Sequence, residues 1–258
     1  MKSKQKNITV RTLKRRNFLI IFGISAATIL LVVWFVVFCR VKTITVKNNL
    51  TITTETILSA AKIKENRHLF SIDLDKVESA VETISPYIRS VTAERNIPSE
   101  ITITVEEYSA DYYIVLEDIC YLLSDSLFVL EEIPLSESET QTGARLTLPE
   151  IKEIQVGSTI VFEEKENMTY ILNLLSFFGK STLSDTITVL RLAEKADIRA
   201  EIDTHYEIRF ASANGLEKKL SLCEESIAYL RKNMYGVKGI LHAATTDEVT
   251  FELTGVAE

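Results

Sequence analysis

Ser59 and Lys62 have the spacing of a nucleophilic serine and its base. In the pattern Ser59-Ala60-Ala61-Lys62, a helix would place the lysine one turn after the serine. In serine acyl transfer such a lysine removes the hydroxyl proton inside a dry pocket, and the serine oxygen then attacks a carbonyl carbon. The pattern fixes only two positions and also arises by chance. It defines one hypothesis, a serine acyltransferase.

A second motif bears on this hypothesis. Ser212-Ala213-Asn214 resembles the Ser-x-Asn motif of penicillin-binding proteins. Their Lys-Thr-Gly motif does not follow, and the nearest segment is Val237-Lys238-Gly239. The helix that would carry Ser59 also belongs to a small β-α-α-β-β unit with no room for a cleft. A penicillin-binding-like enzyme that uses Ser59 and Lys62 stays the alternative function.

Other chemistry-bearing residues are isolated. The three histidines lie more than thirty residues apart and form no metal-ligand motif. Four glutamate doublets occur, but neighbours on a strand point to opposite faces and cannot flank one bond. We therefore expect no catalytic residue, cofactor, metal or small-molecule substrate. The histidines are His68, His205 and His242, and the doublets are Glu106-Glu107, Glu131-Glu132, Glu163-Glu164 and Glu224-Glu225.

The stretch Phe18–Phe38 contains no charged side chain. As a helix it would be about 31 Å long, close to the ~30 Å hydrocarbon core of a bilayer. It is longer than the apolar region of a signal peptide, and no small-x-small cleavage site follows it. The sequence predicts an uncleaved single-pass anchor in the cell membrane.

Charge predicts the orientation of this anchor. The tail before it is rich in Lys and Arg and has no acidic residue, which favours a cytoplasmic N-terminus and an extracytoplasmic C-terminus. Residues 40–258 keep 22 of the 29 basic residues and all 36 acidic ones, a net charge of −14. Such an acidic exterior argues against nucleic acid, and against a surface that lies on anionic lipid. The basic tail residues are Lys2, Lys4, Lys6, Arg11, Lys14, Arg15 and Arg16.

The chain has an odd number of cysteines, and they are widely spaced: Cys39, Cys120 and Cys223. A Cys120–Cys223 disulfide is compatible with an oxidising exterior, but nothing in the spacing supports it. We expect isolated, small apolar side chains.

Residues 41–108 predict a β-α-α-β-β unit. Alternating β-branched residues indicate a strand at Lys42–Lys47. Thr53 and Asp73 are placed to cap two helices. The apolar alternation then predicts an antiparallel hairpin of Ile88–Arg95 and Ile101–Glu106. Two helices on one face of a three-stranded sheet would bury a small core.

Residues 109–258 predict a mixed, mainly antiparallel β domain with helices, so the fold class is α+β. Leu135–Thr142 is the expected polar loop, and Asn214-Gly215 is expected to form a hairpin turn. The expected strands are Tyr112–Val115, Ile119–Leu123, Leu127–Leu130, Thr186–Leu192, Ile198–Ile202, Tyr206–Phe210, Leu216–Leu220, Gly239–Ala243 and Glu248–Leu253, and the expected helices are Asn167–Phe178 and Leu222–Asn233.

These elements resemble a known family. The stretch Val91 to Glu106, VTAERNIPSEITITVE, looks like part of a POTRA domain. Directly after a single span with a basic tail, it resembles the FtsQ/DivIB family of bacterial division proteins. The family usually continues Glu-Arg-x-Pro, where this chain has Glu106-Glu107-Tyr108-Ser109. The expected domains are a basic cytoplasmic tail (1–17), a transmembrane helix (18–38), a POTRA domain (41–108) and an extracytoplasmic β domain (109–258).

The resemblance implies a binding scaffold at the division septum. Its implied partners are FtsB/DivIC-type and FtsL-type bitopic proteins, with which it helps control septal peptidoglycan synthesis. A third hypothesis is an anchored sensor of wall fragments. For that, the sequence offers no aromatic-lined sugar groove, since its one tryptophan, Trp34, lies in the span.

The resemblance also implies a partner-binding segment, since the family's last strand contacts the FtsB/DivIC-type protein. The corresponding residues here are Val249, Thr250, Phe251, Glu252 and Leu253, and Ala243 aligns with a family tyrosine one strand earlier. A terminal strand is often a sheet edge with unpaired N–H and C=O groups, which a partner strand can pair with. We expect Thr250→Pro to remove one such outward donor.

Overall fold

The computed structural model describes residues 3–47, 51–136, 143–234 and 236–256, in two compact units. The first unit comprises Met1–Ile84 and Ile88–Glu107, and the second comprises Ser85–Tyr87 and Tyr108–Glu258. Most of the expected polar loop, residues 137–142, lies outside the described residues.

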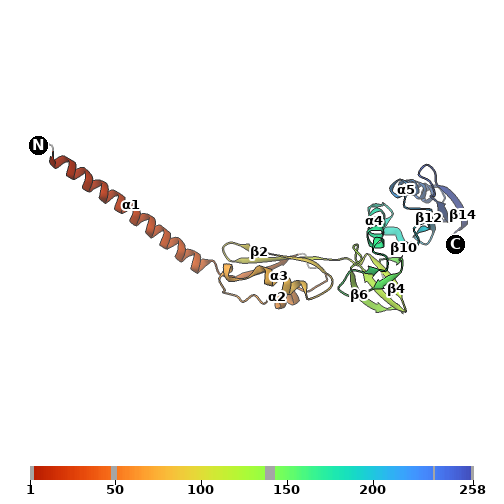
Figure 1. The fold of residues 1–258 in the computed structure, drawn as a ribbon, viewed down its shortest axis with the longest axis horizontal. Coiled ribbons are helices and arrows are strands. Elements are labelled where there is room, and N and C mark those ends of the chain that lie inside the picture. The colour runs from red at the N-terminus through yellow and green to blue at the C-terminus, as the bar shows by residue number, and fades with distance from the viewer. Residues whose placement is uncertain (1–2, 48–50, 137–142, 235, 257–258) are drawn as a thin grey trace. The chain divides into compact units, whose positions relative to one another are not determined.

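Helix α1, Ser3–Phe38, contains the expected span (Figure 1). Its segment Phe18–Phe38 is long and apolar enough to cross a membrane, and none of it is buried against protein. An apolar helix that exposes large side chains on every face needs an apolar solvent, which supports a membrane anchor.

The first unit has the predicted β-α-α-β-β order (Figure 1). Its three strands lie in the order β1-β3-β2, with β1 parallel and β2 antiparallel to β3. Ile101, Ile103 and Val105 point from β3 into the core, whereas Thr102 and Thr104 point to the other face. The elements are β1 (Thr43–Lys47), α2 (Thr54–Ala61), the short 3₁₀ helix η1 (Leu69–Ser71), α3 (Leu74–Glu82), β2 (Ile88–Asn96) and β3 (Glu100–Glu107).

The two expected helix caps differ. The Thr53 hydroxyl accepts a hydrogen bond from the Thr56 amide at the start of α2, as predicted. Asp73 precedes α3 but makes no capping hydrogen bond, and its carboxylate instead pairs with Lys76 at 2.8 Å. The Lys76 ammonium holds the Asp73 pKa below its usual value.

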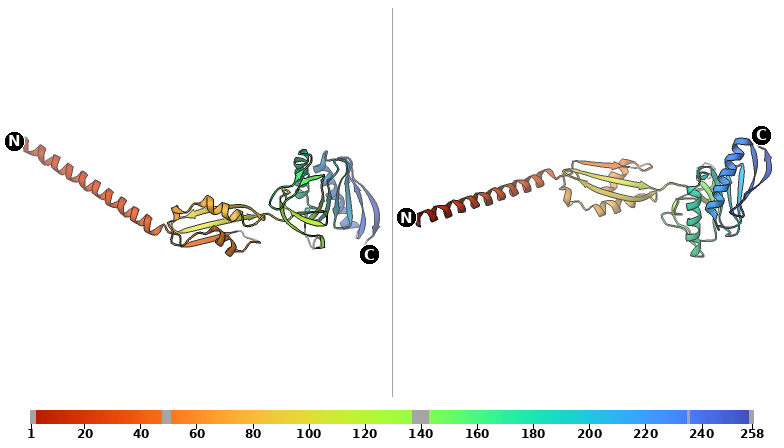
Figure 2. Two further views of the ribbon diagram at one scale, coloured as in Figure 1. Left: turned by 60° about the horizontal axis from the view of Figure 1, so that its bottom comes forward. Right: turned by 90° about the horizontal axis from the view of Figure 1, so that it is seen from above.

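The second unit contains a nine-stranded sheet in the order β14-β13-β12-β11-β10-β7-β4-β5-β6. Figure 2 shows this sheet running from the green strands to the blue β14. The pairs β13–β12, β10–β7 and β7–β4 are parallel and the others antiparallel, so the predicted mixed, mainly antiparallel class is confirmed. The strands are β4 (Tyr112–Leu116), β5 (Ile119–Leu123), β6 (Val129–Pro134), β7 (Ala144–Thr147), β10 (Ile187–Arg191), β11 (Ile198–Ile202), β12 (Tyr206–Phe210), β13 (Val237–His242) and β14 (Thr250–Val256).

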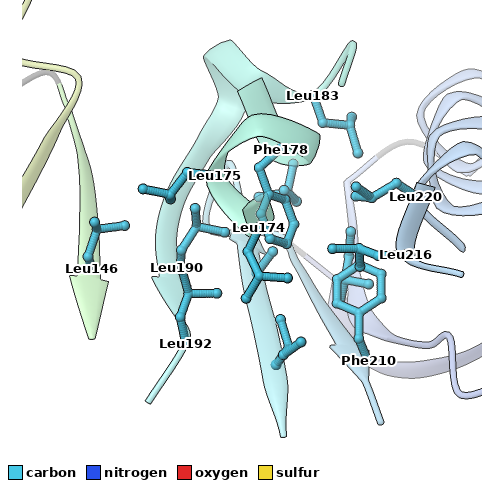
Figure 3. Close-up of a cluster of buried hydrophobic side chains, with 14 of the residues drawn as sticks. Leu146, Leu174, Leu175, Phe178, Leu183, Leu190, Leu192, Phe210, Leu216 and Leu220 are labelled. Carbon is cyan, nitrogen blue, oxygen red and sulfur yellow. The ribbon is translucent and has the colours of Figure 1, made fainter. Parts of the chain in front are cut away.

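Two helices cover the core face of this sheet. Helix α4, Glu166–Lys180, contributes Leu174, Leu175 and Phe178, which pack against strand residues such as Leu190 (Figure 3). Helix α5, Leu216–Asn233, adds its own apolar stripe. A separate two-stranded sheet, β8 (Ile151–Glu153) and β9 (Val161–Phe162), and a 3₁₀ turn, η3 (Ser184–Thr186), complete the unit.

The expected strand Leu216–Leu220 is wrong, since these residues form the first turns of α5. The buried residues of α5 include Leu216, Leu220, Cys223, Ile227 and Leu230, at alternating steps of four and three that match a helix. Gly215, with φ of 65°, precedes α5 as its N-cap and is not part of a hairpin turn. The strand expected at Leu127–Leu130 begins instead at Val129, because Leu127 has a positive φ of 59°.

All three cysteines are free and fully buried. They pack as small apolar side chains, as expected. Burial raises the pKa of the Cys223 thiol to about 12, which suppresses the reactive thiolate.

Candidate partner-binding edge

Strand β14 lies at one end of the nine-stranded sheet. It pairs antiparallel with β13 from Thr250 opposite His242 to Val256 opposite Val237. Among the described residues, no strand pairs with its other side. The strand begins two residues later than expected and extends three residues further, so Val256 joins the edge.

Hydrogen bonds on the far side of β13 show which β14 backbone groups face outward. The Gly239 amide donates to His205 and the Ala243 amide to Arg209, both toward β12. Backbone groups alternate along a strand, so those of Ile240 and His242 face β14 and pair with Glu252 and Thr250.

The N–H and C=O groups of Phe251 and Leu253 therefore point away from the sheet. This corrects the expectation for Thr250→Pro, because the Thr250 amide faces β13. A proline at Thr250 would weaken the sheet itself and would not test its edge. Leu253 is the position where a proline removes an outward donor.

The side chains of β14 leave an apolar surface at this edge. Phe251 and Val249 are both half-buried against the core. Leu253 and Val256 are 56% and 66% exposed. Exposed large apolar side chains beside unpaired backbone groups favour strand addition by a partner. We call Phe251, Leu253 and Val256 the open edge.

Gly239 in β13 fixes the position of the open edge. A Cβ atom at Gly239 would lie 2.4 Å from the Glu252 carbonyl oxygen and 2.5 Å from two carbons of the Phe251 ring. No side chain fits between the two strands there, so glycine permits the close approach of Phe251.

Ala243 does not lie on this surface. Its side chain is fully buried, and its backbone amide donates a hydrogen bond to the carbonyl of Arg209. A contact at the family's tyrosine position would therefore have to come from a neighbouring residue. The sequence alignment alone could not show this burial.

A row of basic side chains crosses the face opposite the helices. Arg191, Arg199, Arg209 and His242 are direct neighbours across β10, β11, β12 and β13, and the row ends beside Thr250. A second row, two residues along each strand, contains Glu201, Glu207 and Glu252. Like charges that lie side by side within one row repel each other. The opposite charges of the neighbouring row offset this repulsion.

Ion pairs join the two rows. Arg191 contacts Glu201 at 2.6 Å and Arg209 contacts Glu207 at 2.8 Å, whereas His242 and Glu252 share a hydrogen bond of 3.1 Å. Hydrogen bonds from Arg209 hold the pKa of Glu207 below its usual value. In the same way, Arg199 lowers the pKa of Asp197. The carboxylates of Glu207 and Asp197 on this face therefore stay ionised at neutral pH.

The residues of the enzyme hypothesis do not form a site. The Ser59 hydroxyl donates to the Thr56 carbonyl at 2.8 Å, and Ser59 and Lys62 are both exposed. Lys62 ends α2 in a left-handed conformation. The Ser212 carbonyl, in the second unit, accepts a hydrogen bond from the buried Lys219. The dry pocket that a serine–lysine pair requires is not formed at Ser59.

No group of three or more His, Cys, Asp or Glu side chains in the described part of the chain is placed to hold a metal ion. His68, His205 and His242 each contact different neighbours.

Val256 of the open edge, and Gly239, which sets the position of that edge, were missed from the sequence. Val256 follows the expected strand end and is out of phase with the alternation of Val249, Phe251 and Leu253, because the register shifts between Lys238 and Gly239. Gly239 was placed in the preceding strand without a role. An isolated glycine inside a strand indicates close approach of another backbone or ring, which is what Gly239 provides.

Comparison with known proteins agrees with this architecture. Residues 39–108 match the model of the POTRA domain, FtsQ-type. The cell division protein DivIB of Clostridium tetani is 26% identical over 71% of this chain and 68% of its own length. DivIB of Clostridium botulinum is 27% identical over 86% of this chain and 82% of its own. The cell division protein FtsQ of Syntrophotalea carbinolica is 27% identical over 69% of this chain and 55% of its own. Residues 39–108 thus form an FtsQ-type POTRA domain after one apolar helix, and with such relatives aligned well beyond that domain the chain is similar to bacterial cell division proteins of the FtsQ/DivIB family.

Proposed function

We propose that this chain is a non-catalytic, bitopic scaffold of the bacterial division machinery. It binds FtsB/DivIC-type and FtsL-type proteins at the septum and helps control septal peptidoglycan synthesis. The observation that carries the proposal is the open edge, where outward backbone groups and exposed Leu253 and Val256 occur together. The names of these relatives, cell division proteins DivIB and FtsQ, support a role in division.

The proposed binding mode is strand addition to β14. A partner segment would pair with the backbone of Phe251 and Leu253, and its side chains would cover Leu253 and Val256. The rows of charges on the adjacent face would set the register, because misplaced like charges destabilise a complex.

The proposed topology places the basic tail in the cytoplasm and residues 39–258 outside. Seven Lys and Arg residues before an apolar helix, with no acid among them, support this orientation. Replacement of all seven by Gln should give mixed insertion in a protease-protection assay. Unchanged protection in that variant would show that the large exterior domain determines the orientation.

Co-purification from solubilised membranes tests the scaffold. The full-length double variant Leu253→Lys/Val256→Lys should lose the FtsB/DivIC-type protein, and with it the midcell signal of a fluorescent fusion. The control is Val161→Lys, which changes an exposed apolar residue of β9 in the same unit. Full partner recovery with a folded double variant would place the binding surface elsewhere, as on the POTRA domain.

Labelling with a fluorescent β-lactam tests the alternative enzyme. Exposed Ser59, already hydrogen-bonded to Thr56, should give no labelled band. A band that disappears in Ser59→Ala would show that the chain is not solely a scaffold.

A further inference from the structure

The end of the POTRA domain that joins α1 consists of three segments. The backbone of residues 39–42 binds the segment 66–69 through three hydrogen bonds, among them Leu69 N–H to Cys39 O at 2.8 Å. Lys42 and Thr43 both donate to the Ser99 carbonyl, in the turn between β2 and β3 (Figure 1). We call residues 39–42, 66–70 and 95–99 the span-proximal end.

The exposed apolar side chains of the domain gather at this end. Among the described residues from Cys39 to Glu107, only Phe70 and Ile97 expose a large apolar side chain, at 46% and 64%. Both belong to the span-proximal end, whereas the other described surface residues of the domain are polar, small or half-buried. Such a gathering marks a contact surface.

Phe70 lies at the level of the last turn of the span. Its ring centroid is 5.1 Å from that of Phe35, and the His68 ring is equally close to Phe35. Phe35 precedes the end of α1 at Phe38 by three residues, or about 4.5 Å along the helix axis. When Phe18–Phe38 crosses a bilayer, Phe70 must therefore lie within the boundary between headgroups and acyl chains.

The chain holds Phe70 in this position. Leu69, next to it, is fully buried, and the Arg95 guanidinium donates to the carbonyls of Leu69 and Ile72. Arg95 also lies over the Phe70 ring, 6.0 Å from its centroid. The exposure of Phe70 thus belongs to a rigid turn.

The charge of this end is opposite to that of the exterior as a whole. Its three segments contain Arg40, Lys42, Arg67 and Arg95 and no Asp or Glu. Arg40, Lys42 and Arg67 are exposed. The acidic residues that directly flank the segments are Glu65, Glu94 and Glu100, and the Glu100 carboxylate already accepts a hydrogen bond from Thr45.

We propose that the span-proximal end binds anionic phospholipid of the leaflet through which the span leaves the membrane. Arg40, Lys42 and Arg67 contact lipid phosphates, while Phe70 and Ile97 enter the acyl boundary. The inference rests on the membrane anchoring under the proposed function. It also refines the expectation that an acidic exterior keeps away from anionic lipid, because that charge is an average over both units.

Fluorescent labels placed at single thiols test this contact. The three native cysteines are fully buried, so a new surface cysteine can be labelled selectively. The full-length variants Phe70→Cys and Ile97→Cys carry an environment-sensitive dye in vesicles that contain phosphatidylglycerol. Glu106→Cys, six residues along β3 from Glu100 and about 20 Å away, is the control for the opposite end. Ala27→Cys, inside the span, reports insertion.

We expect lipids with a quencher near the headgroup to quench the dyes at residues 70 and 97 but not at residue 106. In neutral phosphatidylcholine vesicles, or with Arg40→Gln/Lys42→Gln/Arg67→Gln, the quenching should fall by about half or more. Equal quenching in neutral and anionic vesicles would overturn the role of the phosphates. If aqueous iodide reaches the dyes at residues 70 and 97 while deep quenchers reach residue 27, the span is inserted and the inference fails. In that case the end faces water or another protein. If no deep quencher reaches residue 27, the proposed anchoring itself fails.

Discussion

The two edge strands of the nine-stranded sheet, β6 and β14, differ in whether other segments pair with their outward backbone groups. At β6, Val129 exchanges hydrogen bonds with the segment 157–158, and Pro134 has no N–H to donate. The side chains that follow Val129 and Leu130 include the exposed, charged Glu131 and Glu132. At β14 the outward backbone groups of Phe251 and Leu253 have no strand beside them among the described residues.

The side chains of the two edges differ in the same sense. Charges and proline discourage the addition of a further strand, and β6 carries both. The open edge instead exposes Leu253 and Val256. Within one sheet, then, the β6 edge is protected against the addition of a strand and the β14 edge is not, as the proposed strand addition requires.

Removal of the outward donor at the open edge should have the largest effect. We expect Leu253→Pro to weaken binding of the FtsB/DivIC-type partner by about 2–4 kcal/mol, as for a central interface residue. Leu253→Ser removes the side chain but keeps the N–H, and should cost about 1–2 kcal/mol. Titration calorimetry with the full chain in detergent would measure both. Equal losses for the two variants would mean that side chains alone mediate the contact.

Displacement of β14 should have the next largest effect. Gly239→Ala forces a methyl group against the Phe251 ring and the Glu252 carbonyl, which should lower the free energy of unfolding of the second unit by about 1–3 kcal/mol. Gly255→Ala, in β14 itself, meets no atom within 4 Å and should change it by less than about 0.5 kcal/mol. Denaturant unfolding would compare the variants, and a similar stability for both would argue against the close approach.

Opening the closed edge should have a smaller effect. Glu132→Val/Pro134→Val removes a charge and restores an N–H on β6, so we expect weak, concentration-dependent self-association of the full chain. Sedimentation would detect it, with Val161→Lys as a soluble control. A strictly unchanged sedimentation profile would show that the hydrogen bonds between Val129 and residues 157–158 are enough to close this edge.

Acidification should have the smallest effect. The pKa values of Glu207 and Asp197 are lower in the folded chain than in the unfolded chain. Their contribution to folding stability is therefore fully present above their unfolded pKa values and is lost as the pH falls through their folded pKa values. Thermal stability should therefore decline below about pH 4. Glu207→Gln should flatten that decline by less than about 1 kcal/mol, because solvent screens the pair. If the variant and the unchanged chain lost stability identically with pH, Glu207 would make no contribution to the acid sensitivity of the fold.

The first unit could be predicted almost completely from the sequence. Its apolar residues alternate cleanly from Ile101 to Val105, and Thr53 caps α2 as expected. In the second unit, Leu216 and Leu220 satisfied both a strand-like run and a helical step, and Asn214-Gly215 looked like a hairpin turn. In the structure, Leu216 and Leu220 belong to the buried face of α5, and tertiary packing of this kind cannot be read from five residues.

The site was only half predictable. Apolar alternation located the last strand and Phe251, but the direction of its N–H groups depends on which strand lies behind β13. That neighbour is β12, and all of α5 lies between β12 and β13 in the sequence. No local pattern encodes a pairing between strands so far apart. For the same reason, the burial of Ala243 could not be foreseen.

Within the described part of the chain, strand β14 pairs with β13 alone, and a short connection joins the two. The other eight strands stay paired when it detaches, so local opening of this hairpin costs less than global unfolding. Hydrogen exchange along the strand should then alternate. The amides of Thr250 and Glu252, bonded to β13, exchange only when the hairpin opens, while those of Phe251 and Leu253 exchange from the closed state. A bound partner strand would erase this alternation, so exchange rates at neighbouring residues report whether the edge is occupied.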